Sequence, residues 1–556
     1  MPLLPKSGQP FSKIIKEGFL YIDKTEYIYN LAKSETCLFL SRPRRFGKSL
    51  LLGAMRELFR GNRELFTGLW IGKSDYDFTP YPVIHIGMTG ACDTKEELKN
   101  SISSELRRAA VMNGLKVAFL EPSLMLGEIF AALMEKFGPD VEATVLIDEY
   151  DAPIQSVIAD PVRARENRSV LHSFYGKLKT LSDEGRVRFL FVTGVTKFAK
   201  ASFFSVFNNY HDLTLDRAYA GICGFTIPEF EDRLAGHLPG ILEFNKSMGF
   251  LPAQTTLADF KALVYDFYDG YSWDGKTRVL NPFSVVNFLS ARTLDPYWFN
   301  SATPTFLMEL IRDNPGALNR VEAHPLNVRE LEAVDVANLK LVPLLFQTGY
   351  LTVDKWLDSK NCSLREPNQE VSEALNASIV EALTGREEEN IKALGRGLRR
   401  ALHEANSAAL AEHFKEILNW IPHEIHVPLE NYYHSVFLAV LKALSLKVRS
   451  EESTAEGRLD LRLELSGQSL YIFEFKFKKY PPGTNSKTKA RSRAKTKTEA
   501  EIKAELMAAA IEEAKTQIID KGYAQRDLRE YEIVRQVAVG IVGRSLVGAE
   551  LVKGES

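Results

Sequence analysis

One stretch decides how the first part of the chain folds, and it reads Cys37-Leu38-Phe39-Leu40-Ser41-Arg42-Pro43-Arg44-Arg45-Phe46-Gly47-Lys48-Ser49. A short apolar strand runs into a tight loop, and a helical pattern follows over residues 50–59. Backbone N–H groups in such a loop and at the helix N-terminus hold a phosphate. Lys48 brings its charge to the outer phosphates, and Ser49 offers a hydroxyl to Mg²⁺. The stretch therefore predicts a nucleotide-binding loop formed by residues 42–49.

The loop departs from the GxxxxGK[ST] pattern, because Arg42 stands where that pattern has glycine and Pro43 lacks a backbone donor. A Gly-Lys-Ser tripeptide alone also occurs at ordinary helix N-termini. A second motif favours the nucleotide site: the apolar strand of residues 144–147 ends in Asp148 and Glu149. We expect Asp148 to coordinate Mg²⁺ and Glu149 to polarise the attacking water. A third strand ends at Thr193, whose hydroxyl we expect to sense the γ-phosphate.

Composition places the chain among ordinary globular proteins. Its 556 residues predict two to four domains, and a formal charge of −2 gives no whole-chain argument for nucleic-acid binding. The four cysteines form no CxxC pair, which argues against a zinc site or disulfide framework and fits a reducing compartment. We find no signal peptide and no apolar run of about 20 residues, the length that spans a bilayer. The cytoplasm is the expected location, with no membrane partner.

The pattern of apolar residues divides the chain into three regions. Residues 1–227 alternate short apolar strands, expected at 37–40, 83–86, 144–147 and 189–192, with amphipathic helices. This order predicts an α/β domain with a parallel sheet of the P-loop NTPase kind. Residues 228–428 have mainly helical spacing and are interpreted as a lid or linker region. Residues 429–556 predict a smaller α/β domain. Its expected elements are a helix over 432–446, strands over 447–451, 459–465 and 469–477, a helix over 501–519 and a strand over 534–542.

The last region contains a candidate metal-dependent site. Glu474 and Lys476 are two residues apart in a strand, so both side chains leave the same face, and Asp460 lies one hairpin upstream. Two carboxylates and a cation are what Mg²⁺-assisted phosphodiester hydrolysis requires. Polar residues alternating with phenylalanine also describe an ordinary half-exposed strand. We interpret Asp460 and Glu474 as metal ligands and Lys476 as the positioning cation, with Glu430, Glu451, Gln517 and Tyr523 as secondary candidates.

A basic segment follows the Glu-x-Lys strand. Residues 478–498 carry eight lysines and arginines and no acidic residue. One interpretation is a solvated, disordered insertion. The other is a flexible arm that neutralises phosphates beside the candidate site.

The chain resembles the bacterial and archaeal AAA-ATPase-like proteins that end in a PD-(D/E)xK nuclease domain. The motifs that carry the resemblance are Asp23-Lys24-Thr25, residues 42–49, 147–151, 193–195, 224–226, 268–271, 281–284 and 347–352. The resemblance covers nearly the whole chain and implies that Arg42 in place of glycine is normal. It also implies a restriction-endonuclease-like fold at the C-terminus. That family has a short link after the Glu-x-Lys strand, where this chain has its basic insertion. Arg44 and Arg45 either contact phosphate or pair with Asp148 or Glu149, and the sequence leaves both possibilities open.

These observations favour an enzyme that binds and hydrolyses ATP and cleaves DNA or RNA with Mg²⁺, or with Mn²⁺ in its place. The alternative is an ATP-driven switch that oligomerises or signals, with a C-terminal domain that binds nucleic acid without cleaving it. A third interpretation is that the nucleotide loop is vestigial. Assembly into a homo-oligomer is left open by the sequence.

Overall fold

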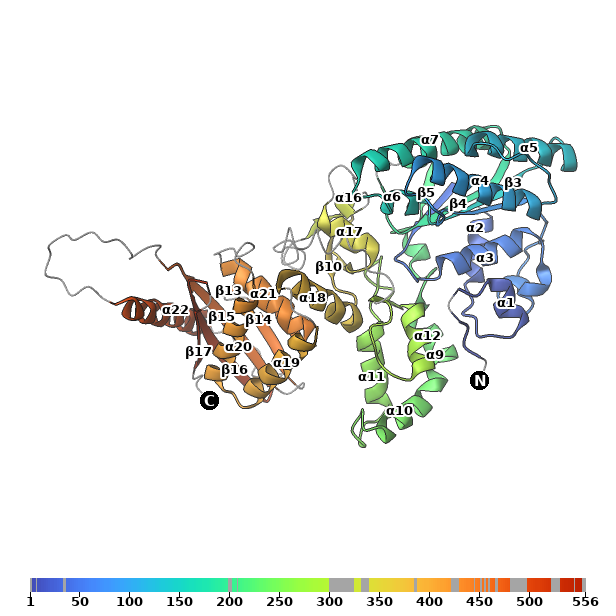
Figure 1. The fold of residues 1–556 in the computed structure, drawn as a ribbon. Coiled ribbons are helices and arrows are strands. Elements are labelled where there is room, and N and C mark those ends of the chain that lie inside the picture. The colour runs from blue at the N-terminus through green and yellow to red at the C-terminus, as the bar shows by residue number, and fades with distance from the viewer. Residues whose placement is uncertain are drawn as a thin grey trace, which may run out of the picture. The chain divides into compact units, whose positions relative to one another are not determined.

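The computed structural model divides the chain into two compact units. The first comprises Met1–Thr303 and Pro325–Glu370, and the second comprises Pro304–His324 and Val371–Ser556. The structure describes residues 3–6, 8–33, 37–198, 203–207, 209–299, 325–331, 340–384, 388–421, 430–444, 446–450, 453–454, 457–458, 461–465, 469–480, 498–521, 531–544 and 546–552. Figure 1 shows the helices and strands of the two units.

The first unit is built on a five-stranded parallel sheet in the order β2-β3-β4-β1-β5. Its central strands are buried on both faces, which explains their continuous apolar sequence. The four strands expected at 37–40, 83–86, 144–147 and 189–192 are all present. The strand bounds are Cys37–Ser41 for β1, Val83–Gly87 for β2, Ala143–Asp148 for β3, Val187–Gly194 for β4 and Tyr210–Asp212 for β5.

Helices cover both faces of this sheet. In Figure 1, α4, α5 and α7 lie on one side of the sheet, and α1 and α3 lie on the other. Thr94 begins α4 with a capping box, and Asp160 caps α7 by accepting from two backbone N–H groups. The helix bounds are Phe11–Lys16 (α1), Thr25–Ala32 (α2), Lys48–Phe59 (α3), Lys95–Met112 (α4), Pro122–Phe137 (α5), Ala152–Gln155 (α6), Pro161–Asp183 (α7) and Phe203–Val206 (α8).

The rest of the first unit is helical with two small sheets. Helices α9 to α12 form a separate apolar core around Phe230, Phe260 and Phe288. The two-stranded β6-β7 and the three-stranded β8-β10-β9 sheets were not expected from the helical spacing of this region. The bounds are Phe225–Thr226 (β6), Ile227–Arg233 (α9), Leu238–Ser247 (α10), Leu257–Tyr268 (α11), Val279–Leu280 (β7), Pro282–Ala291 (α12), Leu326–Asn327 (β8), Val328–Leu331 (α16), Leu341–Thr348 (α17), Thr352–Trp356 (β9) and Asn361–Arg365 (β10).

The second unit holds a mixed five-stranded sheet in the order β11-β14-β15-β16-β17. Strands β15 and β16 are parallel, and the other pairs are antiparallel. Helices α20 and α21 pack on the face that carries Phe473 and Phe475, and α22 packs on the opposite face. The edge strand β17 is an addition to the expected order. A two-stranded β12-β13 pair lies outside the main sheet.

The element bounds in this unit agree with the expected ones to within a few residues. Helix α18 spans the boundary between the units, since it begins at Gln369. The bounds are Gln369–Thr384 (α18), Glu388–His403 (α19), Ser407–Trp420 (α20), Glu430–Ala443 (α21), Lys447–Ser450 (β11), Ser453–Thr454 (β12), Gly457–Arg458 (β13), Leu461–Leu465 (β14), Ser469–Lys478 (β15), Glu499–Lys521 (α22), Ile533–Val542 (β16) and Leu546–Val552 (β17).

The α/β class expected for both ends of the chain is confirmed. The expected three-part division at residues 227 and 428 remains an interpretation of the sequence. All four cysteines carry free thiols. Within the described ranges, no helix combines the length and the apolar character needed to cross a bilayer.

Candidate functional site

The predicted nucleotide loop lies at the carboxyl edge of the parallel sheet. Strand β1 ends at Ser41, beside Gly194 at the end of β4, and the Arg42 N–H donates to the Gly194 carbonyl at 3.2 Å. Residues 42–47 then turn directly into α3. Ligands of open α/β sheets bind at this edge, where the strands end and the loops gather.

The backbone of the loop is shaped to receive an anion. Arg45 and Gly47 adopt positive φ angles of 66° and 89°, which is the alternation that forms a concave cluster of N–H groups. The N–H groups of residues 44–49 donate no hydrogen bond to any described residue. We infer that a polyanion is the acceptor of these N–H groups, because a loop and helix N-terminus of this kind bind phosphate. A β-carbon at Gly47 would meet no atom within 4 Å, so glycine is favoured there by its φ angle and not by space.

Lys48 is buried beneath this loop. Its ammonium donates to the carbonyls of Arg42 and Pro43, both at 2.9 Å. Burial lowers the pKa of Lys48, while the negative charges of Asp148, Asp151 and Glu149 oppose that shift. The lysine charge therefore lies between the phosphate loop and the carboxylates at the end of β3.

Asp148 and Glu149 complete the group at the end of β3. Burial raises the pKa of Asp148, and a hydrogen bond from the Ser49 side chain and the charge of Lys48 act in the opposite direction. Its Oδ1 atom is buried and accepts no hydrogen bond from any described residue. A hydroxyl and a carboxylate oxygen are ligands that Mg²⁺ prefers, so Ser49 and Asp148 fit a nucleotide-bound Mg²⁺.

Glu149 is half-buried and has a φ angle of 51°, an uncommon backbone conformation for a residue with a side chain. Burial is the largest cause that raises the pKa of its carboxyl group, followed by the charge of Asp148. The charges of Lys48, Arg44 and Arg45 oppose this shift. Glu149 is thus a carboxylate of increased basicity close to three cations.

The side chain of Arg42 makes structural contacts inside the first unit. Its guanidinium donates to the carbonyls of Ser41, Thr214 and Tyr219 and lies 3.9 Å from the centroid of the Trp273 ring. Burial lowers its pKa to about 10. Arg42 therefore takes part in the loop through its backbone carbonyl, which accepts from Lys48.

The other loop side chains and Thr193 contact neighbouring residues of the first unit. Arg44 is exposed and donates to Gln155 Oε1 at 3.1 Å. Arg45 is exposed and lies over the Phe283 ring, and Phe46 is buried. Within the described ranges neither arginine forms an ion pair with Asp148 or Glu149. The Thr193 hydroxyl donates to the Leu40 carbonyl at 2.8 Å, which joins β4 to β1.

Asp151 has a structural role that the sequence did not assign. Its carboxylate accepts from the N–H groups of Val195 and Thr196, at 3.1 and 2.6 Å, and from Gln155 Nε2 at 2.6 Å. Burial raises its pKa to about 6. Tyr150 donates to the Thr196 carbonyl at 2.8 Å. These two residues fix the loop after β4 against the end of β3. The only sequence signal was that they follow Glu149 within a quoted motif.

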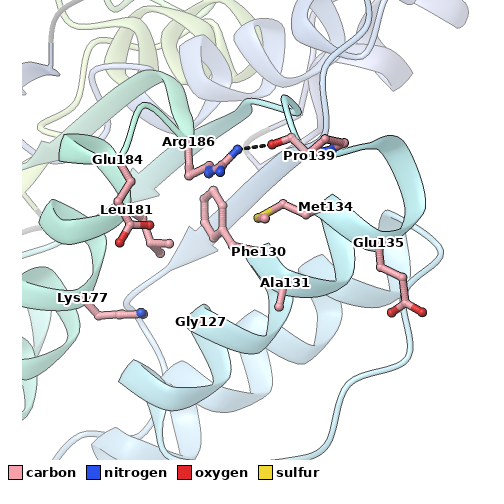
Figure 2. Close-up of a pocket in the computed structure, with 10 residues that line it drawn as sticks. All are labelled: Gly127, Phe130, Ala131, Met134, Glu135, Pro139, Lys177, Leu181, Glu184 and Arg186. Carbon is pink, nitrogen blue, oxygen red and sulfur yellow. Dashed lines mark hydrogen bonds between the residues drawn. The ribbon is translucent and has the colours of Figure 1, made fainter.

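A hollow of about 500 Å³ lies elsewhere on the first unit. Figure 2 shows Phe130 and Met134 from α5, Lys177 and Leu181 from α7, and Arg186, which donates to the Pro139 carbonyl. No residue of the nucleotide loop and neither carboxylate at the end of β3 lines this hollow. It is therefore separate from the site at the sheet edge.

The second candidate site lies on β15, the middle strand of the C-terminal sheet. Glu474 is fully buried, and Lys476 is 9% exposed. Lys476 Nζ donates to Glu474 Oε1 at 2.8 Å and to the Phe475 carbonyl at 3.2 Å. The two side chains share a strand face as expected from their spacing, while Phe475 packs on Phe437 across the other face.

The other residues predicted for this site are Asp460, Glu430, Glu451, Gln517 and Tyr523. Asp460, Glu451 and Tyr523 lie outside the described residues. Glu430 is the first residue of α21, and Gln517 is half-buried on α22. Leu461, which follows Asp460 in the sequence, pairs with Phe473, the neighbour of Glu474. Among the residues described, no group of three or more His, Cys, Asp or Glu side chains is arranged to hold a metal.

Comparison with known proteins matches both ends of the chain. Residues 5–204 match the family model described as predicted AAA-ATPase, and residues 429–550 match the PD-(D/E)XK nuclease superfamily. The chain is also similar to an uncharacterized protein in the vnfD 5′ region of Azotobacter chroococcum mcd 1. The two are 33% identical over 491 residues, which is 86% of this chain and 90% of that protein. No solved structure matches significantly.

Proposed function

The chain belongs to the family that joins a predicted AAA-ATPase domain to a PD-(D/E)XK nuclease domain, and from its two sites we propose that it binds and hydrolyses ATP and cleaves nucleic acid with a divalent metal. The observation that carries the first activity is the loop of residues 42–49. The N–H groups of residues 44–49 have no acceptor among the described residues, and the buried Lys48 interacts electrostatically with Asp148 and Glu149.

In the first unit the loop N–H groups and Lys48 hold the triphosphate. Ser49 and Asp148 hold Mg²⁺, which when bound supplies neutralisation of the phosphate charge. Glu149 orients the water and accepts its proton, because burial and the neighbouring Asp148 increase the basicity of its carboxylate. Arg44, which Gln155 holds at the edge of the loop, adds positive charge beside the phosphates.

In the second unit Asp460 and Glu474 hold the divalent metal, and Lys476 positions the water or the scissile phosphate. Burial of a carboxylate and an ammonium side by side is costly and contributes little to stability. The Glu474–Lys476 pair is buried on the middle strand of the sheet, with only Lys476 slightly exposed, and this favours a catalytic role over a structural one. Glu430, Glu451, Gln517 and Tyr523 remain secondary candidates for this site.

The nuclease proposal is tested by cleavage of single- and double-stranded DNA and RNA in Mg²⁺, with and without ATP. Glu474→Gln is expected to lower the cleavage rate by roughly 100-fold or more, because metal-assisted charge stabilisation contributes several kcal/mol. Glu464→Gln on the adjacent strand is the matched control, since Glu464 is half-buried and hydrogen-bonded to Tyr531. Equal rates for the wild type and Glu474→Gln would refute the site.

The nucleotide proposal is tested by thermal unfolding in Mg²⁺-ATP. A ligand at 100 times its Kd stabilises the fold by about 2.7 kcal/mol, so the wild type is expected to melt at a higher temperature. Lys48→Ala is expected to remove that increase. If Mg²⁺-ATP does not raise the melting temperature of the wild type, the nucleotide loop is vestigial. ATP binding without cleavage of any substrate would favour the switch.

A further inference from the structure

The conformation of the nucleotide loop is set by a distant part of the first unit. Each of the five consecutive loop residues 42–46 meets at least one residue from the segment 271–349. The pairs are Arg42 with Trp273, Pro43 with Gly349, Arg44 with Trp298, Arg45 with Phe283, and Phe46 with Tyr271. The loop therefore changes its shape only if this segment also moves.

Two of these contacts are especially close. A β-carbon at Gly349 would lie 2.7 Å from Pro43, so the end of α17 is packed directly on the loop. The Trp298 indole Nε1 donates to the Arg44 carbonyl at 3.0 Å, and Trp298 is fully buried. This hydrogen bond fixes the orientation of the peptide that carries the next loop N–H group, that of Arg45.

Trp298 is in turn held by a buried carboxyl group. The Trp298 N–H donates to Glu370 Oε1 at 2.7 Å, and the Ser284 hydroxyl oxygen lies 2.8 Å from each Glu370 carboxyl oxygen, within hydrogen-bond distance of both. Glu370 is 0% exposed. These two hydrogen-bonding partners fix the position of the buried carboxyl group.

Glu370 occupies a special place in the chain. It is the last residue of the first unit and the second residue of α18, and from Val371 onward the same helix belongs to the second unit. A continuous series of hydrogen bonds thus runs from the Arg44 carbonyl through Trp298 to the start of the helix that leads out of the first unit.

We propose that Trp298 and Glu370 are positioning residues that tie the phosphate loop to α18, so that occupancy of the nucleotide site regulates the C-terminal unit. This inference rests on the proposed ATP binding. A phosphate on the loop N–H groups fixes the Arg44 peptide, which fixes Trp298 and then the first turn of α18. Coupling of this kind is reciprocal, so a change at α18 alters the affinity for ATP by the same factor.

The test is hydrogen exchange of the full chain, with and without saturating Mg²⁺-ATP, followed at residues 42–50 and in α18. Trp298→Phe keeps an aromatic ring and removes the donor to Arg44. We expect ATP to slow exchange at both places in the wild type. In Trp298→Phe we expect protection at residues 42–50 alone, with ATP affinity lowered roughly threefold to tenfold, the effect of one lost hydrogen bond.

Trp356→Phe is the matched control, because the Trp356 indole N–H has no acceptor among the described residues, and it is expected to behave like the wild type. Should Trp298→Phe fail to fold, Glu370→Ala, which removes the acceptor of the Trp298 N–H, is expected to give the same loss of protection in α18. Protection of α18 that persists in these variants, or that is absent in the wild type while residues 42–50 are protected, overturns the coupling alone. Absence of protection at residues 42–50 in the wild type overturns ATP binding and the coupling together.

Discussion

Gly194→Ala is the substitution whose cost is clearest from the structure. A β-carbon at Gly194 would lie 2.3 Å from Asp151 Oδ1 and 2.6 Å from the Tyr150 ring, whereas ordinary contacts begin at 3.4 Å. The Asp151 carboxylate would have to retreat by about 1 Å, because protein interiors are close-packed. That movement breaks its hydrogen bonds to the N–H groups of Val195 and Thr196.

The loss of free energy of unfolding in Gly194→Ala has two contributions. Overpacking of a buried site costs about 1–3 kcal/mol. Two weakened hydrogen bonds add about 0.5–1.5 kcal/mol each. We therefore expect Gly194→Ala to lower the free energy of unfolding of the first unit by about 2–6 kcal/mol, and to weaken ATP binding because the loop after β4 adjoins the site.

Urea unfolding followed by tryptophan fluorescence, together with ATP titration, measures both effects. Gly176→Ala is the matched control, since a β-carbon there meets no atom within 4 Å and the position lies inside α7. It is expected to stabilise the protein by about 0.5–1 kcal/mol. The reasoning is refuted if Gly194→Ala unfolds at the same urea concentration as the wild type or as Gly176→Ala.

Two further predictions concern the surroundings of the loop. Burial raises the pKa of Glu370 from 4.5 to about 8, so the native state keeps a proton that the unfolded state releases, and this contribution to stability is lost as pH rises from about 4.5 to 8. Glu370→Gln is expected to gain stability relative to the wild type across that window, and a pH-independent difference in urea midpoint contradicts this. Trp273→Leu exposes the buried Arg42 guanidinium and is expected to cost about 3 kcal/mol by urea unfolding. Trp70→Leu, at a side chain 41% exposed, is the control, and an equal loss in both variants contradicts the role of the Arg42 contact.

Local sequence patterns predicted those strands and helices whose own residues show a clear periodicity of apolar and polar side chains. The buried strand β1, the helix α3 after Gly47 and the shared face of Glu474 and Lys476 all follow from spacing of apolar and polar residues over a few positions. Strand β17 was missed, although it pairs with β16 as an edge of the sheet, because several of its positions are small or exposed and give no clear alternation.

Sequence alone determined the class of each end of the chain and predicted which residues bind phosphate and metal, since these inferences depend on chemical type and short-range periodicity. Tertiary structure decided what the neighbouring side chains do. Arg42 looked like part of the phosphate site, yet its guanidinium is used by Thr214, Tyr219 and Trp273. The local sequence does not single out Glu370, whose buried carboxyl group is held by Ser284 and Trp298. Such roles arise from partners dozens to hundreds of positions away, and periodicity along the chain contains no information about which distant residues meet.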